Sequence, residues 1–390
     1  MKICLINPPS PFLSDQGALP PLGLFYIAAS LDKYTDIFMI DVGLGDAIPE
    51  DADIYAFTCN ITQSDWCKEN IHKYGKFGRT IIGGAYPTIT YDSCGADQLI
   101  IGEGEENILQ AVKYPNKNIF YNSGNIPIDT IKIPARRLCK AERYKYLIDG
   151  KASSPIFTSR GCPYACAFCS KGVFNKTRFR SVDNVIQEIE EIIALGFSAI
   201  RIYDDSFICN YKRAMELLDM IKPLNIKWKA EINSKNLYKD ELAKKMSDAG
   251  CVEVAIGIES GSQTILDNIN KRTTILQHTK AVNLCMKYGI KTRAYLMVGL
   301  PGESWKTINE TKDWLHLAKP DSIGIGIFCP YPGSDIYNHP EKYDIKIWPH
   351  SNKDLFFRGR KGEQRCFVST NNLTRAEILE AKQLIEEAYS

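Results

Sequence analysis

The sequence has almost no excess charge, no long apolar run and only five histidines. Its 48 basic and 46 acidic side chains leave a formal net charge of +2, so no bulk attraction to nucleic acid or to an anionic membrane is expected. No stretch approaches the ~18 consecutive apolar residues of a membrane span. The apolar start, Lys2 to Ile6, is too short for the core of a signal peptide. We therefore expect a cytoplasmic protein without membrane attachment.

The length of 390 residues exceeds what one hydrophobic core usually supports, which predicts two structural units. Hydrophobic residues make up 44% and charged residues 24% of the chain, a composition that excludes wholesale disorder and collagen-like repeats. Thirteen cysteines are spread along it. Because a large chain without an export signal is expected in a reducing compartment, these cysteines indicate metal binding or burial and not disulfides.

Short apolar runs alternate with helical patterns over residues 1–113. This alternation predicts a Rossmann/flavodoxin-like domain, a parallel sheet covered by helices, with ligands at the carboxyl ends of the strands. The crossover from Asp41 to Asp53 contains Gly43, Gly45 and Pro49, so we expect its helix to be missing or rudimentary. Residues 114–150 lack periodicity and are predicted to be a linker, whose basic cluster is either a solvated face or an anion site.

From residue 151 the alternation resumes with longer helices and six strands. Six units are too few for a closed eight-unit barrel, so residues 151–334 are predicted to form a partial (β/α)6 TIM-type barrel with its chemistry at the carboxyl ends of the strands. The expected fold class is therefore α/β. Residues 335–390 are a C-terminal extension that ends in a helix, which Thr374 and Glu377 can cap.

Three cysteines directly follow the first barrel strand, in the sequence Cys162-Pro-Tyr-Ala-Cys166-Ala-Phe-Cys169. A loop without helical hydrogen bonds can turn all three thiolates toward one centre. A structural zinc ion takes four protein ligands, but no second Cys-x-x-Cys follows and no histidine lies nearby in the sequence. The three thiolates fit a cubane 4Fe-4S cluster with one iron that has no protein ligand. A zinc site and a redox switch are the alternatives.

This Cys-x3-Cys-x2-Cys spacing resembles the cluster loop of the radical S-adenosylmethionine (SAM) superfamily. Four further segments at strand ends are similar to that family's barrel motifs: Tyr203 to Phe207, Gly257 to Ser262, Met297 to Glu303, and Tyr331 to Ser334. The amino-terminal half is similar to the cobalamin-binding domain of one large subgroup through Asn7-Pro8-Pro9, Pro20 to Leu24, Ile82 to Thr88 and Gly102 to Glu106. The resemblance covers the chain from Met1 to about Ser334.

The resemblance implies that the cluster binds SAM at its open iron and cleaves it reductively to methionine and a 5'-deoxyadenosyl radical. By position, Cys162, Cys166 and Cys169 are the iron ligands. The SAM contacts carried over in the same way are Phe168, Asp204, Asp205, Glu259, Ser260, Gly299 and Pro301. Structural alternatives exist for these residues, because an acidic residue at a strand end can cap the next helix and a glycine can serve a turn.

One departure from the family pattern concerns the third barrel strand. In similar proteins this strand often ends with an arginine, which pairs with the SAM carboxylate. Here Glu231 and Asn233 stand at its end and are themselves candidate SAM contacts. Without the guanidinium the carboxylate needs another partner. Lys235 and Arg293 are the two candidates.

The subgroup resemblance also implies cobalamin. The predicted contacts are residues at the carboxyl edge of the first sheet, namely Leu22, Gly23, Thr58, Gly83, Gly84, Gly102, Glu103 and Gly104. Older relatives of this subgroup supply a histidine ligand to cobalamin from an Asp-x-His-x-x-Gly stretch, and no such stretch is present here. His72 lies in a polar helix, where we expect it to face solvent. Cobalamin is therefore expected to bind without a histidine ligand. The alternative is a vestigial domain that braces the barrel.

The preferred hypothesis is a radical SAM enzyme that modifies an unactivated carbon of a small-molecule substrate by cobalamin-dependent methyl transfer, with flavodoxin or ferredoxin as one-electron donor. A cobalamin-independent rearrangement, cyclisation or oxidation is the alternative, and a non-catalytic iron–sulfur or corrin sensor is another. Cys329, after the sixth strand, is either a hydrogen donor or radical relay, or a packing residue. A nucleic-acid track over the basic groups at 136–145 and 171–180 is not favoured, because the overall charge is balanced.

Overall fold

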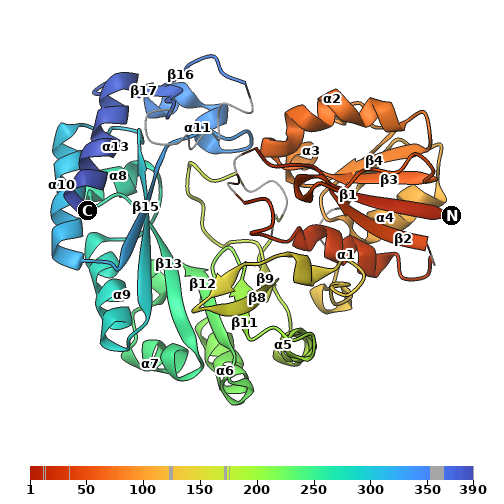
Figure 1. Cartoon of the computed structure of the whole chain (residues 1–390). Coiled ribbons are helices and arrows are strands. Elements are labelled where there is room, and N and C mark those ends of the chain that lie inside the picture. Colours follow the sequence, from red (N-terminus) through yellow and green to blue (C-terminus); the bar gives the residue numbers. More distant parts are fainter. Residues whose placement is uncertain are drawn as a thin grey trace. The chain divides into compact units, whose positions relative to one another are not determined.

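The structure, a computed structural model, describes residues 1–11, 13, 15–34, 36–122, 126–170, 174, 176–351 and 364–389. The chain divides into two compact units. The first contains Met1–Tyr146 and Lys171–Ser181, and the second contains Leu147–Ser170 and Val182–Ser390. Each unit is built around its own, mainly parallel, sheet (Figure 1).

A six-stranded sheet forms the first unit, in the order β2-β1-β3-β4-β5-β6. Every neighbouring pair is parallel, as the alternation predicted. The strands are β1 (Lys2–Asn7), β2 (Asp36–Asp41), β3 (Ile54–Thr58), β4 (Arg79–Gly83), β5 (Gln98–Ile101) and β6 (Ile119–Tyr121). Since all strands run the same way, their carboxyl ends share one edge, and the topological switch point lies between β1 and β3.

Helices cover both faces of this sheet. They are α1 (Leu22–Ser30), α2 (Ser64–Tyr74), α3 (Ala85–Thr90) and α4 (Gly104–Lys113). Helix α1 packs on α4 on one face, and α2 and α3 cover the other (Figure 1). Between β2 and β3 the chain forms a single 3-10 turn, Val42–Leu44, so the expectation of a rudimentary crossover is confirmed.

The chain after α4, predicted to be a linker, packs on the first unit. It supplies β6 and two 3-10 turns, Ile128–Thr130 and Ala141–Arg143. The Ala135 N–H donates to the carbonyl oxygen of Phe25 in α1 across 3.0 Å. The Tyr144 ring meets the Phe25 ring edge-on, with 6.4 Å between the ring centres.

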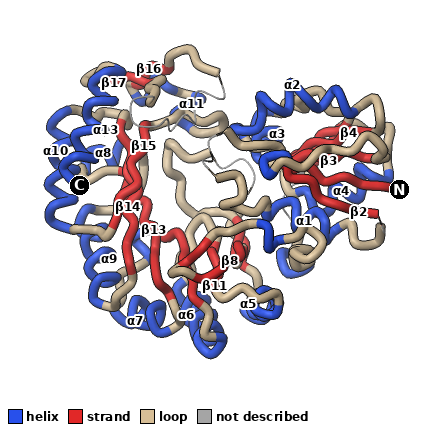
Figure 2. The backbone as a smooth tube through the Cα atoms, viewed as in Figure 1, coloured by secondary structure: helices blue, strands red, loops and turns tan. Residues whose placement is uncertain are grey.

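A curved seven-stranded sheet forms the second unit, in the order β15-β14-β13-β12-β11-β8-β7 (Figure 2). Its strands are β7 (Leu147–Ile148), β8 (Lys151–Ile156), β11 (Ala199–Ile202), β12 (Lys227–Ile232), β13 (Cys251–Glu259), β14 (Lys291–Val298) and β15 (Ser322–Ile327). The neighbouring pairs from β8 to β15 are parallel, and β7 is antiparallel to β8. The predicted open (β/α)6 barrel is therefore confirmed.

The helices between these strands lie on the convex side of the sheet (Figure 2). They are α5 (Val182–Ala194), α6 (Tyr211–Ile221), α7 (Asp240–Asp248), α8 (Gln263–Asn268), α9 (Ile275–Lys287) and α10 (Trp305–Ala318). Helix α5 shows why they pack there. Its buried residues Val185, Ile189 and Ile192 recur at the spacing that places them on one helical face.

The C-terminal extension packs on the second unit. Its elements are α11 (Asp335–Asn338), β16 (Ile345–Ile347), β17 (Val368–Thr370) and α13 (Arg375–Tyr389). Strands β16 and β17 are antiparallel, and α13 packs on α10 and β15. The predicted cap is present, because the Glu377 N–H donates to Thr374 Oγ1 at 3.3 Å and the Thr374 N–H donates to the Glu377 carboxylate at 2.8 Å.

Candidate functional site

The cysteine loop, residues 161–170, is hydrogen-bonded to the segments that follow four other strands of the curved sheet. The Gly161 N–H donates to Asp205 after β11, and the Tyr164 hydroxyl donates to Asn236 after β12, at 3.1 and 2.6 Å. Further along, the Ala167 N–H donates to Ile269 O at 2.9 Å and the Ser170 hydroxyl donates to Pro332 O at 2.6 Å. The loop is therefore held at the carboxyl ends of the parallel strands, where the chemistry of this fold is expected.

The donor set of this loop fits an iron–sulfur cluster. Cys162 and Cys166 are half-buried and Cys169 is exposed. All thirteen cysteines lie within the described residues, and none forms a disulfide. Among the residues that the structure describes, no three His, Cys, Asp or Glu side chains are close enough together to hold a single metal ion. A cubane cluster binds each thiolate at a different iron, so three thiols spread over one loop fit a cubane cluster.

A buried ion pair lies beside the cysteine loop. The Lys271 Nζ is 2.6 Å from Glu259 Oε1, and the two side chains are only 8% and 10% exposed. The same ammonium lies 5.7 Å from the centre of the Phe168 ring. Glu259 has a φ of +65° at a shift in the β13–β14 register, a backbone strain typical of functional sites. Thus Glu259, predicted from its motif, is joined by Lys271, which no strand-end motif contains.

Asp204 and Asp205, after β11, hold the chain that leads into the cysteine loop. Asp204 is 1% exposed and accepts hydrogen bonds from the backbone N–H groups and the hydroxyls of Thr158 and Ser159, at 2.5 to 3.0 Å. Burial raises the pKa of its carboxyl, while these donors act in the opposite direction. Four donors occupy the four lone-pair positions of a carboxylate, so Asp204 binds backbone and hydroxyl groups where a SAM contact was predicted.

Asn233, at the place of the family's arginine, has a local role. Its side-chain oxygen accepts from the Lys235 N–H at 3.0 Å and caps the 3-10 turn Ser234–Asn236. That turn presents Asn236 to Tyr164 of the cysteine loop. Lys235 itself is exposed. The asparagine therefore supports the loop through Asn236.

Three other predicted SAM contacts have neighbours away from the loop. Arg293 is the third residue of β14 and lies five residues before the strand's end, about 16 Å at ~3.3 Å per residue. The buried Ser260 hydroxyl lies 3.2 Å from the Thr311 hydroxyl of α10. Glu231 forms an ion pair with Arg201 at 3.3 Å. Arg293 is thus near the wrong end of its strand for the predicted role.

The turn after β14, Gly299 to Glu303, is braced from within. Gly299 has a φ of +94°, and its N–H donates to the buried Glu303 carboxyl. Burial raises the pKa of Glu303 to about 8. The Asn268 side chain donates to Pro301 O at 3.0 Å. These bonds fix the backbone of Gly299 and Pro301, which the family resemblance assigned to SAM binding.

The C-terminal extension braces the same turn from outside. A Cβ on Gly299 would lie 3.2 Å from Val368 of β17 and 3.3 Å from Ile378 of α13. The Thr370 hydroxyl donates to Glu303 O, and the Asn372 side chain donates to Gly302 O, both at 3.4 Å. The extension, which matched no motif in the sequence, therefore forms part of the support for this turn.

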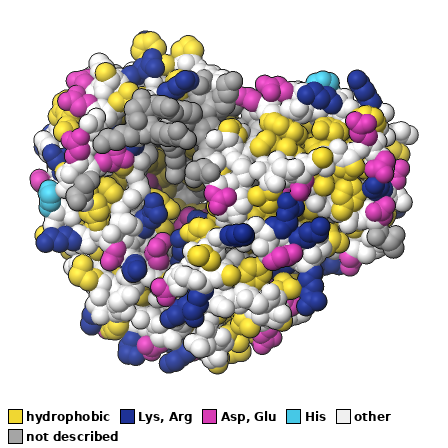
Figure 3. Space-filling view, viewed as in Figure 1, with side chains coloured by type: hydrophobic (Ala, Val, Ile, Leu, Met, Phe, Trp, Pro, Cys, Tyr) yellow, Lys and Arg dark blue, Asp and Glu magenta, His cyan; other side chains and the backbone are white. Residues whose placement is uncertain are grey.

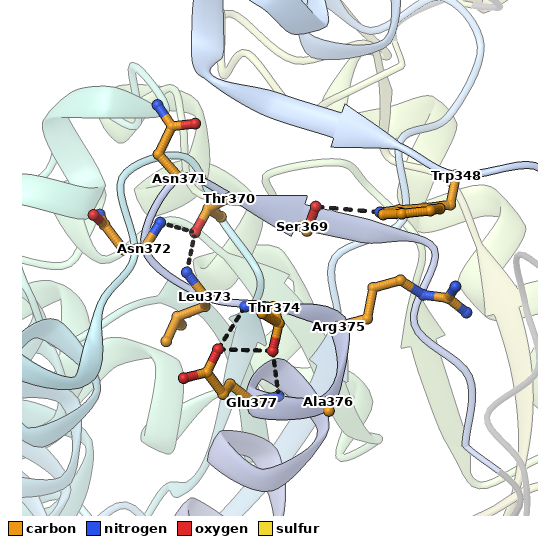
Figure 4. Close-up of a pocket in the computed structure, with 10 residues that line it drawn as sticks. All are labelled: Trp348, Ser369, Thr370, Asn371, Asn372, Leu373, Thr374, Arg375, Ala376 and Glu377. Atoms are coloured by element: carbon orange, nitrogen blue, oxygen red, sulfur yellow. Dashed lines mark hydrogen bonds between the residues drawn. The ribbon is translucent and has the colours of Figure 1, made fainter.

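A pocket of about 380 Å³ opens in the extension (Figure 4). It is lined by Trp348 and by residues 369–377, from the end of β17 to the first turn of α13. The Trp348 indole N–H donates to the Ser369 hydroxyl at 3.2 Å, and the capping bonds between Thr374 and Glu377 close the lower side in the view. No residue predicted to bind the cluster or SAM lines this pocket.

Cys329 follows the last barrel strand at its carboxyl end. The preceding residue, Phe328, donates its N–H to Val298 O at 2.7 Å, which extends the pairing of β14 and β15 by one residue. The Cys329 side chain is half-buried. Its predicted role as a hydrogen donor remains a prediction.

The glycines predicted to contact cobalamin lie at the carboxyl edge of the first sheet, but three of them are explained by packing. A Cβ would lie 2.6 Å from Cys59 O at Gly84 and 2.5 Å from Asn122 O at Gly102. At Gly104 it would lie 2.7 Å from the side chain of Ile27 in α1. Leu22 is buried in the core. Glycine at 84 and 102, where φ is positive and the close atoms are backbone, is required by the fold whether or not a ligand binds.

Glu103, another predicted cobalamin contact, forms a buried ion pair with Arg178 of the same unit. The Glu103 side chain is 1% exposed and that of Arg178 is 16% exposed. Arg178 also donates to Ile126 O at 2.8 Å. The Glu103 carboxylate is therefore paired with a guanidinium. Because Arg178 is largely buried in this pair, it does not belong to a basic track on the surface.

The remaining candidates at this edge, Gly23, Thr58 and Gly83, have short side chains or none. Gly23 is exposed, and nothing lies within 4 Å of the place where its Cβ would be. Thr58 and Gly83 are half-buried at the ends of β3 and β4. His72 is exposed on α2, as predicted. This edge fits a flat macrocycle bound without a histidine ligand.

The basic groups do not form one accessible track in the described part of the chain. Arg136 and Arg180 are buried. Arg143 makes a two-pronged ion pair with Asp46 at 2.7 and 2.9 Å. Lys171 lies outside the described residues. On the face that Figure 3 shows, basic and acidic side chains are interspersed.

None of the helices in the described ranges combines the length and the apolar character that crossing a membrane requires.

Sequence comparison relates part of the chain to a family and most of the chain to named enzymes. Residues 156–315 match the radical SAM superfamily. The bacteriochlorophyllide d C-12(1)-methyltransferase of Chlorobaculum tepidum is 30% identical over 361 residues, which cover 86% of this chain and 77% of the relative. An anaerobic magnesium-protoporphyrin IX monomethyl ester cyclase of Rubrivivax gelatinosus is 26% identical, with 88% and 72% covered.

Two solved structures have the same fold over nearly the whole chain. The radical SAM methyltransferase TsrM of Kitasatospora setae, solved with cobalamin and a 4Fe-4S cluster bound, gives a TM-score of 0.77 at 15% identity and covers 99% of this chain and 91% of its own. The cobalamin-dependent SAM radical enzyme OxsB gives a TM-score of 0.72 at 17% identity and covers 99% and 65%. At these identities the likeness shows the fold alone.

Proposed function

The chain belongs to the radical SAM superfamily, and from this premise we propose that it is a cobalamin-dependent methyltransferase that acts on a small-molecule substrate. The observation that carries the proposal is the cysteine loop, which hydrogen bonds hold beside the buried Lys271–Glu259 pair. The proposal is supported by the methyltransferase relative and by the likeness of both units to TsrM, whose structure contains cobalamin and a cluster.

The second unit is assigned the SAM chemistry. In this superfamily the reduced 4Fe-4S cluster supplies one electron to SAM bound at its open iron, and bound cobalamin supplies a carrier for the methyl group. Cys162, Cys166 and Cys169 would hold the cluster. The loop is tied to four neighbouring segments, which limits how far its backbone must reorder when iron binds. Cys169 is exposed, which gives a one-electron donor such as flavodoxin or ferredoxin a side from which to approach.

Glu259 and Lys271 would recognise the zwitterionic end of SAM. The Glu259 carboxylate can accept from the SAM amino group, and the Lys271 ammonium can donate to the SAM carboxylate. A charge-assisted hydrogen bond in a place this poorly solvated is stronger than one at the surface. Lys271 then does what the arginine does in related proteins, and it is better placed than the exposed Lys235 or Arg293. Phe168 and the backbone of Gly299 to Pro301 would receive the adenine.

The first unit is assigned the corrin. Gly23, Thr58 and Gly83 would form the surface on which it lies, and no histidine of the described residues at this edge competes as a ligand. Between β2 and β3 the chain forms a 3-10 turn in place of a crossover helix, so no helix covers that part of the edge. A reducing cytoplasm suits both this assignment and thirteen cysteines without disulfides.

The test is anaerobic reconstitution with iron and sulfide, with and without hydroxocobalamin, followed by dithionite and SAM. We expect about four irons per chain, lost in Cys162→Ala, Cys166→Ala and Cys169→Ala but kept in Cys139→Ala, which removes a buried thiol of the first unit. Release of S-adenosylhomocysteine only in the cobalamin-loaded sample supports methyl transfer.

Two other results would point elsewhere. If 5'-deoxyadenosine is released at the same rate with and without cobalamin, the radical rearrangement, cyclisation or oxidation is the better assignment, as the cyclase relative would suggest. A full cluster without any SAM cleavage would contradict an enzyme and favour a sensor.

A further inference from the structure

Asp204 is buried in the second unit at a place where two strands leave the sheet. Strands β8 and β11 pair in parallel up to Ile156 and Ile202, and the Tyr203 N–H donates to Ile156 O at 2.9 Å. Beyond that point the pairing of β8 with β11 ends. The Asp204 side chain takes over, because it accepts from Thr158 and Ser159, the residues that follow β8 toward Cys162.

The Asp204 carboxylate accepts two hydrogen bonds from backbone N–H groups and two from side-chain hydroxyls. Oδ1 accepts from the Thr158 and Ser159 N–H groups at 2.6 and 3.0 Å, and Oδ2 accepts from their hydroxyls at 2.5 and 2.7 Å. Arg213 of α6 binds the same segment, since its guanidinium donates to Thr158 O at 2.9 Å. Next along the chain, Gly161 is held by Asp205 at 3.1 Å. The residues from Thr158 to Gly161 are therefore fixed almost one by one, and Cys162 is the next residue.

We propose that Asp204 is a positioning residue, which fixes the chain between β8 and Cys162 and thereby sets where the first thiolate is presented to the cluster. It acts through Thr158 and Ser159 and touches neither SAM nor iron. The identity of the cluster rests on the proposed function, but the clamp itself does not. A buried carboxylate with every lone pair used is costly to place and is retained only where its bonds are needed.

Two substitutions separate hydrogen bonding from charge. Asp204→Ala removes all four acceptor positions. Asp204→Asn removes the charge and can keep the bonds, because its oxygen can accept from the two N–H groups while its NH₂ donates to the two hydroxyls, which are acceptors as well as donors. Asp321→Ala is the matched control. Asp321 accepts from the N–H and hydroxyl of Thr292 at 2.7 and 3.0 Å, near the amino end of β14.

The first measurement is hydrogen–deuterium exchange of peptides that contain residues 158–162, in the full chain before iron is added. We expect exchange about tenfold faster in Asp204→Ala, near the unmodified rate in Asp204→Asn, and unchanged at 158–162 in Asp321→Ala. The second is the EPR spectrum of the reduced cluster with and without SAM, which should change in Asp204→Ala and be restored in Asp204→Asn.

Unmodified exchange and EPR in Asp204→Ala would overturn the proposal. Equal damage in Asp204→Asn and Asp204→Ala would also overturn it, because charge and not positioning would then be the cause. If Asp204→Ala does not fold, Thr158→Val with Ser159→Ala removes the two hydroxyl donors and should loosen the same peptides to a smaller extent. Failure of the unmodified chain to bind iron would count against the proposed function and leave the exchange test valid.

Discussion

Lys271 donates to Glu259 across 2.6 Å at a place that solvent barely reaches. The two residues are separated by twelve positions and by helix α8, and they meet because Glu259 turns into the left-handed region at the end of β13. A charge pair that is nearly dry depends strongly on each partner, since removal of one leaves the other buried and unpaired. This dependence makes the pair a sensitive place to test the site.

Lys271→Met should weaken SAM binding by about 30-fold, because a buried charge partner is typically worth about 2 kcal/mol or more in recognition. It should also lower the melting temperature, since Glu259 loses its counter-charge. Adding Glu259→Gln should restore the melting temperature and leave SAM binding weak. Anaerobic calorimetric titration with SAM measures the first effect, and Lys287→Met, which breaks an exposed pair with Asp240, is the control. Normal SAM affinity in Lys271→Met would remove this lysine from the site.

Gly257→Ala should disturb the same pair without changing any charge. The new Cβ would lie 2.6 Å from Glu259 Oε1 and 2.9 Å from Lys271 Nζ, so one of them must move. Both atoms are the far ends of flexible side chains, so they can shift at little cost in stability, and we expect SAM binding to weaken with only a small fall in melting temperature. Gly326→Ala, in β15, meets nothing within 4 Å and should be close to neutral. Equal behaviour of the two alanine variants would show that the space beside the pair is not needed.

Glu303 predicts a pH dependence of stability. Its carboxyl loses its proton near the ordinary pKa of 4.5 in the unfolded chain and near about 8 in the folded one. Between these values the folded state binds more protons, so this residue's contribution to the free energy of unfolding falls as pH rises, by at most ~1.4 kcal/mol per pH unit. Glu303→Gln should therefore gain stability relative to the unmodified chain from pH 5 to pH 8.

Melting curves of both proteins across this range measure the difference. Glu377→Gln is the control, because hydrogen bonds from Thr374 lower the pKa of that carboxyl, the opposite direction to the shift at Glu303. A constant difference between Glu303→Gln and the unmodified chain would mean that Glu303 is ionised in the folded state at neutral pH.

Gly23→Phe tests the corrin surface of the first unit. The position is exposed and open, so the ring should not disturb the fold but should obstruct a flat ligand at this edge. We expect cobalamin affinity to fall at least about tenfold while the melting temperature stays unchanged. Ser30→Phe, seven residues later and about 10 Å along α1, should leave binding unaffected. Visible absorption during titration with hydroxocobalamin gives both affinities, and equal affinities would place the corrin elsewhere.

The sequence predicted most of the fold because its signals are local. Helix α6 is an example, because its apolar residues recur at helical spacing and Asn210 caps its first turn. Strands β6, β16 and β17 were missed because three residues carry too little periodicity to be recognised. Helix α8, with six residues between two loops, was missed for the same reason.

The candidate site was predictable only where its residues are neighbours in sequence. The three cysteines share one loop, so their spacing alone indicated the cluster. Lys271 reaches Glu259 and Phe168 through the folded chain, and no spacing rule contains that contact. Asp204 was placed correctly at a strand end, but the four donors that surround it depend on the neighbouring strand. Burial and partners, which the structure supplies, decide whether such a residue meets a ligand or the backbone.

The contact of Val368 and Ile378 with Gly299 implies an order of assembly during synthesis. The cysteines are synthesised about two hundred residues before Val368 and Ile378. A newly made chain therefore has its thiols before the turn at Gly299 is packed from outside. Iron loaded at that early stage would meet a half-built pocket. Maturation of this enzyme is therefore expected to follow completion of the barrel and its extension, with the apoprotein as the species that receives its metal.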